Sequence, residues 1–212
     1  MPAGSSDLYE KRKGVYPKAV DGFYRRLKWA VMVATLAIYW VTPWLRWDRG
    51  PYAPDQAVLI DLANRRFYMF QIEIWPHEFY YVAGLLIMAG IGLFLVTSAV
   101  GRAWCGYACP QTVWTSIFMW MEQKAEGTRN QRIKLDQSPL SFEKVRKKAL
   151  KHTMWLGFAF WTAFTFVGYF TPIRQLGIDV LGFSVNAWAG FWIAFFAAAT
   201  YINAGWMREQ VC

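Results

Sequence analysis

Four long stretches without a charged residue constrain this sequence more than any other feature. They cover residues 29–45, 79–100, 153–173 and 180–207, with lengths of 17, 22, 21 and 28 residues. A helix needs roughly 20 apolar residues to cross the hydrocarbon core of a bilayer, and buried helices of soluble proteins are ordinarily shorter. We therefore predict an all-α membrane protein with four transmembrane helices. The last run is long enough to begin with a turn, so its span is placed at 186–207.

Basic residues are unevenly distributed among the connections of these spans. Residues 1–28 hold seven basic and three acidic residues, and residues 102–151 hold ten basic and four acidic residues. Residues 46–78 hold four basic and five acidic residues, and residues 174–179 hold one of each. The positive-inside rule then places both termini and the loop 101–152 in the cytoplasm.

This topology divides the chain into a basic cytoplasmic tail, 1–28, and a four-span membrane domain, 29–212, with its outer loop at 46–78. A basic cytoplasmic surface beside anionic lipid accounts for the net charge of +9. The charge therefore gives no reason to expect a nucleic acid as partner.

Several segments between the spans are expected to have structure of their own. Residues 56–61 and 66–75 are rich in β-branched and aromatic residues around a turn, which predicts a short β-hairpin in the outer loop, with an irregular aromatic-anchored loop as the alternative. Residues 111–121 are apolar but too short to span, so a helix there would lie at the interface or pack against the spans. Residues 141–151 are expected to lead into the third span as a helix, with Ser141 as its N-cap.

All three cysteines occur where a predicted span reaches the cytoplasm. Cys105 and Cys109 follow the second span, and Cys212 follows the fourth. Pro110 suits the first turn of a helix and disfavours helical conformation at the residue before it. Cys109 is therefore expected to cap a helix, and the positive end of that helix would stabilise a thiolate.

These positions favour a metal site. The cytoplasm is reducing, so a structural disulfide is not expected there, and thiolates in that compartment suit iron–sulfur clusters, zinc or Cu(I). A Cys-x-x-x-Cys spacing alone is equally compatible with cysteines that act as small apolar residues. The proline, the interfacial position and the third cysteine shift the balance toward metal ligation by Cys105, Cys109 and Cys212.

Other polar residues near the span ends have simpler explanations. Arg102 and Arg208 could balance the charge of thiolates, although anchoring at the cytoplasmic surface is the simpler account. His77 and His152 fall on opposite sides of the membrane in this topology, so they are not expected to share one haem.

Several segments of the sequence resemble one known family. Residues 104–115, WCGYACPQTVWT, are similar to the signature of FixG/CcoG/RdxA-type cytochrome c oxidase accessory proteins, which are membrane ferredoxin-like proteins of bacteria. Residues 8–12, 65–68 and 203–212 resemble the same family. Its members are longer, complete a second Cys-x-x-x-Cys-Pro motif after the residue that matches Cys212, and continue into a domain for two [4Fe–4S] clusters. The resemblance therefore concerns their N-terminal membrane half.

The resemblance also implies a function. It implies a membrane electron-transfer protein that supports copper reduction and delivery and the assembly of a cbb3-type cytochrome c oxidase, with Cu(II) reductase activity in the full-length members. Cys105, Cys109 and Cys212 would hold a [4Fe–4S] cluster or copper, and a fourth thiolate has no counterpart in these 212 residues. Oxidase subunits or other copper-assembly factors would be partners, and the bacterial inner membrane the location. The alternative is a non-redox assembly factor or a Cu(I) chaperone that docks an oxidase subunit.

Overall fold

The chain folds into helices and one small sheet. The computed structural model describes residues 16–17, 21–50, 53–101 and 103–208. Its longer helices are α1 (Phe23–Val41), α2 (Phe79–Val100), α4 (Pro110–Glu126), α6 (Phe142–Val167) and α8 (Ala187–Tyr201). The shorter helices are α3 (Ala103–Tyr107), α5 (Arg129–Gln137) and α7 (Ile173–Leu181), with the 3₁₀ helices η1 (Thr42–Trp44) and η2 (Pro76–Glu78) and the π-helix η3 (Ile202–Trp206). The strands are β1 (Val58–Asp61), β2 (Arg66–Met69) and β3 (Ile72–Ile74).

Four of these helices, α1, α2, α6 and α8, lie over the four predicted spans, and the mainly helical fold is confirmed. Within the described residues, two helical stretches, Pro76–Val100 and Ala187–Trp206, are long and apolar enough to cross a membrane by length and composition. The structure thus supports two of the four predicted spans by this criterion. The helices α1 and α6 fall short because charged residues occupy their N-terminal turns, which leaves a shorter apolar part. The helix predicted for 141–151 is confirmed as the start of α6, which follows Ser141.

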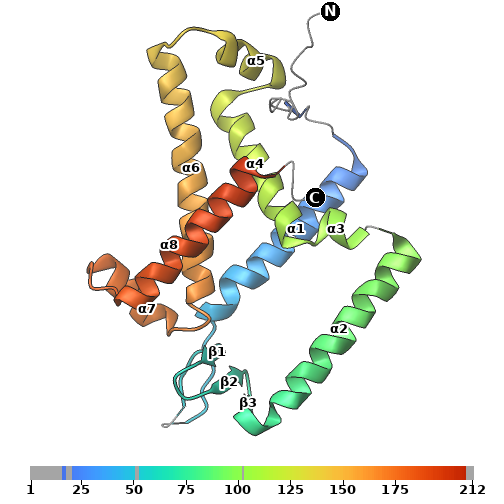
Figure 1. The fold of residues 1–212 in the computed structure, drawn as a ribbon, viewed down its shortest axis with the longest axis vertical. Helices are drawn as coiled ribbons and strands as arrows, with labels where there is room; N and C mark the ends of the chain where they lie inside the picture. Colours follow the sequence, from blue (N-terminus) through green and yellow to red (C-terminus); the bar gives the residue numbers. More distant parts are fainter. Residues whose placement is uncertain (1–15, 18–20, 51–52, 102, 209–212) are drawn as a thin grey trace, which may run out of the picture.

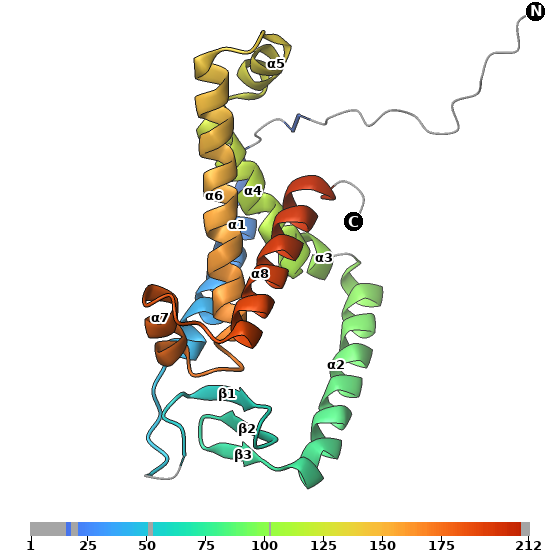
Figure 2. The ribbon, with the colours of Figure 1, turned by 60° about the vertical axis from the view of Figure 1, so that its left-hand side comes forward.

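The helix α2 stands apart from the other helices along most of its length (Figures 1 and 2). It joins the sheet at one end and α3 at the other, and its apolar window is 0% buried within the chain. An apolar surface of this size is unfavourable in water and marks contact with lipid or with another protein.

The helix α4 occupies the centre of the remaining bundle. Its buried residues include Phe118, whose ring lies 5.0 Å from that of Trp155 on α6. The indole of Trp155 also donates a hydrogen bond of 3.3 Å to the Phe118 carbonyl. A Cβ atom on Gly205 of η3 would lie 2.8 Å from Trp155, so glycine permits this close approach. The predicted apolar helix at 111–121 therefore packs against the other helices, and it is longer than expected. The buried cluster consists of Met32, Leu36, Val113, Ile117, Phe118, Met121, Trp155 and Ala204.

The outer loop contains three antiparallel strands in the order β1-β2-β3. The turn predicted between residues 61 and 66 is confirmed by the pairing of Asp61 with Arg66. The single strand predicted for 66–75 was wrong, because the chain reverses at Phe70, which has a positive φ of 51°, and returns as β3. The Arg49 guanidinium donates to the carbonyl of Phe70 and, at 2.6 Å, to that of Ala57, which holds this reversal in place.

The same loop is fastened to the helical bundle by a buried glutamine. The Gln56 amide donates to the carbonyl of Gly168 at 2.7 Å and accepts from the backbone N–H of Ile173 at 3.1 Å. Gly168 follows the end of α6 and Ile173 begins α7, and the backbone N–H of Ile60 adds a bond of 2.8 Å to the carbonyl of Tyr169 in the turn between them. Figure 1 shows this sheet at one end of the long axis and α5 at the other.

Candidate functional site

Two of the predicted ligands lie in a hook between α2 and α4. Cys105 is exposed on the short helix α3, and Cys109 is half-buried at the N-cap of α4 with φ −60° and ψ 128°. This confirms the N-cap predicted from Pro110, which occupies the first turn of α4. The turn between the two cysteines lies at Ala108, whereas Gly106, which was expected in that turn, belongs to α3.

Hydrogen bonds hold this hook closed. The backbone N–H groups of Ala108 and Cys109 both donate to the carbonyl of Trp104, each at 3.0 Å. The hydroxyl of Thr112, in the first turn of α4, donates to the carbonyl of Cys105. The motif is therefore a compact unit in which α3 is tied back onto the helix that Cys109 caps.

The third predicted ligand, Cys212, lies outside the described residues, as does Arg102. Convergence of Cys212 with the other two cysteines therefore stays a prediction. Among the residues that the structure describes, no group of three or more His, Cys, Asp or Glu side chains is placed to hold a metal ion. His152 interacts through Nδ1 with the hydroxyl of Tyr201 at 2.7 Å, on the bundle rather than beside the cysteine hook.

A buried cluster of charges joins α4 to three other parts of the chain. The side chains of Glu122 and Glu126 on α4 are each 3% exposed. Arg132 of α5 pairs with Glu122 at 2.6 Å and with Glu126 at 3.3 Å. Lys151 of α6 lies 2.9 Å from Glu126, and Arg208 lies 3.0 Å from Glu122. Three cations thus surround two carboxylates.

The hydrogen bonds of this charge cluster are incomplete. The contacts of Lys151 and Arg208 lie within ion-pair distance but lack hydrogen-bond geometry, and Nη1 of Arg132 makes no hydrogen bond within the described part of the chain. Arg208 was expected to anchor at the surface or to balance a thiolate. In the structure its side chain pairs with Glu122 of α4, the helix that Cys109 caps.

This charge cluster was not predicted from the sequence, because the basic residues of the loop 101–152 were attributed to a cytoplasmic surface beside anionic lipid. One signal was present in the sequence. Glu122 and Glu126 are one helical turn apart and continue the face on which Phe118 is buried. Carboxylates on a buried face need cationic partners, so the pattern calls for basic side chains from neighbouring helices.

Comparison with known proteins assigns a class to the cysteine hook. A family model described as a 4Fe-4S binding domain matches residues 82–126, which include most of α2, the hook and all of α4. Cys105 and Cys109 both lie in the matched segment, so the match supports an iron–sulfur cluster as the group bound by the hook. No solved structure matches the chain.

The chain is a homologue of FixG, RdxB and RdxA. It is 55% identical over 205 residues to nitrogen fixation protein FixG of Rhizobium meliloti, covering 97% of this chain and 39% of FixG. It is 55% identical to protein RdxB and 50% identical to protein RdxA of Cereibacter sphaeroides, each over 208 residues that cover 98% of this chain and 44% of the relative. The resemblance found in the sequence is thus confirmed, and the chain spans less than half the length of these relatives.

The cysteine sulfurs of this chain are the type of donor atom that iron–sulfur clusters require. Such clusters are held by cysteine thiolates, usually four. The described residues supply two free cysteines, Cys105 and Cys109, and Cys212 is the third in the sequence. The match to a 4Fe-4S binding domain supports the iron–sulfur alternative, and it gives no support to copper as the bound group.

Proposed function

We propose that this chain is the membrane part of an electron-transfer protein in which Cys105, Cys109 and Cys212 are thiolate ligands of a [4Fe–4S] cluster. The observation that carries the proposal is the match of a 4Fe-4S binding domain to the segment that holds the cysteine hook. When bound, a cluster of this class carries one electron at a time. The chain's own contribution is to hold two thiolates on a compact hook. Cys105 is exposed and Cys109 is half-buried there, so a redox partner can approach.

The proposal includes four membrane spans with both termini in the cytoplasm of a bacterial inner membrane. The apolar surface of α2, 0% buried within the part of the chain that the structure describes, supports contact with lipid. The alternation of basic residues between the connections supports the orientation. In this orientation the charged start of α6, together with α5, projects into the cytoplasm, and the sheet lies outside.

The cellular task in the proposal is reduction of Cu(II) to Cu(I) and its delivery during assembly of a cbb3-type cytochrome oxidase. Oxidase subunits or other copper-assembly factors would be its partners. The resemblance to cytochrome c oxidase accessory proteins supports this task, and copper is the substrate here rather than a resident cofactor. A non-redox Cu(I) chaperone is the competing function.

Reduced-minus-oxidised absorption spectra separate the two functions. We expect the chain, reconstituted without oxygen with iron, sulfide and a small thiol, to lose visible absorbance on reduction. After excess thiol and reductant are removed, added Cu(II) should accept an electron from the cluster, become Cu(I) and restore the absorbance. The same preparation of the Cys105→Ser variant serves as the control and should show no such change. A chain that binds Cu(I) but gives no redox-linked spectral change would overturn electron transfer in favour of the chaperone.

A further inference from the structure

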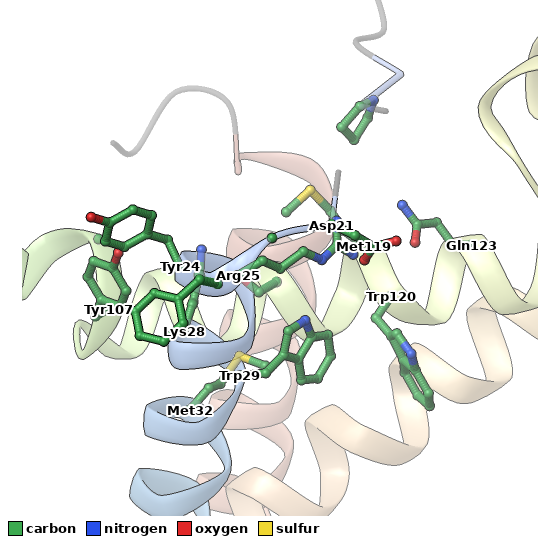
Figure 3. A pocket seen from close by; sticks show the side chains of 15 residues that line it. Asp21, Tyr24, Arg25, Lys28, Trp29, Met32, Tyr107, Met119, Trp120 and Gln123 are labelled. Carbon is green, nitrogen blue, oxygen red and sulfur yellow. The ribbon is translucent and has the colours of Figure 1, made fainter. Parts of the chain in front are cut away.

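A cavity of about 560 Å³ lies between the start of α1, the hook helix α3 and α4. Figure 3 shows Tyr24 and Tyr107 at one end of it and Trp120 at the other, with Arg25 and Lys28 contributed by α1. Its volume falls within the range of pockets that bind small molecules. Arg25 and Lys28 are three residues apart, so they lie on the same face of the helix, and both line the cavity. Asp21 contributes one carboxylate to the same lining, so positive charge is in excess there.

A second cavity of about 440 Å³ adjoins the first. The two share Tyr24 and Tyr107 as lining residues. Apart from these tyrosines and Trp104, the second cavity is lined by small or aliphatic side chains, among them Leu27 and Val31 of α1 and Val96 of α2. A cationic compartment and an apolar compartment thus meet at a common wall, which is the shape of a site for an amphiphile.

The level of the cationic compartment along α1 matches that of lipid phosphates. The charge-free stretch of α1 begins at Trp29, directly after Lys28, so the two cations lie where a spanning helix leaves the hydrocarbon region. Burial, and next the charge of Arg25, lower the pKa of Lys28. A bound anion would favour the charged form of Lys28 and so oppose both effects.

We propose that the two cavities together bind one anionic phospholipid, with its phosphate beside Arg25 and Lys28 and an acyl chain between α1 and the end of α2. Basic pockets between helices on the cytoplasmic side are suited to anionic headgroups. The lipid would also cover part of the apolar surface that α2 leaves exposed next to the cysteine hook. This inference rests on the proposed membrane orientation.

Native mass spectrometry of the detergent-solubilised chain with equal amounts of phosphatidylglycerol and phosphatidylcholine tests the site. We expect one phosphatidylglycerol to be retained in preference to phosphatidylcholine. In the Arg25→Gln/Lys28→Gln variant that preference should fall by roughly tenfold or more, because each basic residue near anionic lipid contributes about a fivefold factor. Arg26→Gln is the matched control, because Arg26 is an exposed neighbour on α1 that lines neither cavity. An equal loss in the Arg26→Gln control would overturn the site in favour of a general effect of net charge.

Further experiments distinguish a bound phospholipid from a free phosphate, and an error in the lipid site from an error in the membrane orientation. Val31→Trp, which fills the apolar compartment without changing charge, should also reduce retention of phosphatidylglycerol. Displacement of the lipid by inorganic phosphate at equal concentration would contradict an amphiphile site. A membrane-impermeant maleimide should label the exposed Cys105 in spheroplasts after permeabilisation and not before. Labelling of intact spheroplasts would overturn the orientation, whereas correct labelling without lipid preference would overturn the lipid site alone.

Discussion

Replacement of Cys109 by serine is expected to abolish cluster binding by the chain when it is reconstituted with iron, sulfide and a small thiol. A serine hydroxyl is a poor substitute for a soft thiolate ligand. Cys109 caps α4 and Cys105 lies on the helix tied back onto it, so both are expected to serve one centre. Cys105→Ser should therefore cause the same loss, and the double variant should be no worse than either single variant. Iron and acid-labile sulfide per chain are the quantities to measure.

Thr112→Ser provides the matched control for these variants. It changes a neighbour of the same motif but retains the hydroxyl that donates to the Cys105 carbonyl, so its cluster content should equal that of the natural sequence. Partial losses that add up in the double variant would mean that the two cysteines belong to separate sites.

Glu122→Gln is expected to destabilise the detergent-solubilised protein by about 3–5 kcal/mol, the usual cost of breaking a buried ion pair by removal of one partner. Glu122 compensates two cations, Arg132 at 2.6 Å and Arg208 at 3.0 Å, in a site from which water is largely excluded. The neutral amide leaves three cations around the single carboxylate of Glu126. Unfolding in a graded series of denaturing detergent measures the change in free energy.

Glu143→Gln is the matched control, because Glu143 makes an exposed ion pair with Lys147 one helical turn away. Such pairs contribute about 0.3–0.5 kcal/mol, so the control should unfold almost like the natural sequence. The Glu122→Gln/Arg208→Gln double variant should lose less stability than the sum of the two single variants, since the second change removes a charge that the first left unpaired. Equal stability of the Glu122→Gln and Glu143→Gln variants would contradict a structural role for the buried charge cluster.

The sequence was most informative where one residue determines local backbone geometry. Pro110 restricts its own φ and the conformation of Cys109, so both the start of α4 and its N-cap followed from two residues. The long apolar runs likewise predicted the positions of α2 and α8, because a charge-free stretch of that length has few alternatives to a helix.

Features that depend on contacts between distant residues could not be predicted in this way. The reversal at Phe70 depends on Arg49, 21 residues earlier, whose guanidinium holds four carbonyl groups of the loop. The burial of Glu122 depends on cations delivered by α5, α6 and the chain after η3. A count of charges along the sequence cannot show such pairings, and it indicated only a basic surface where the structure has a buried charge cluster.

The central claim is that the three cysteines form a cluster site that lacks one thiolate within these 212 residues. Mössbauer spectroscopy of chain reconstituted with ⁵⁷Fe and sulfide, with and without a small thiol as fourth ligand, tests it most directly. We predict the spectrum of a [4Fe–4S] cluster, with about four iron atoms per chain, when the thiol is present and little bound iron when it is absent. A full cluster on the monomeric chain without added thiol, or no cluster under either condition, would contradict the account.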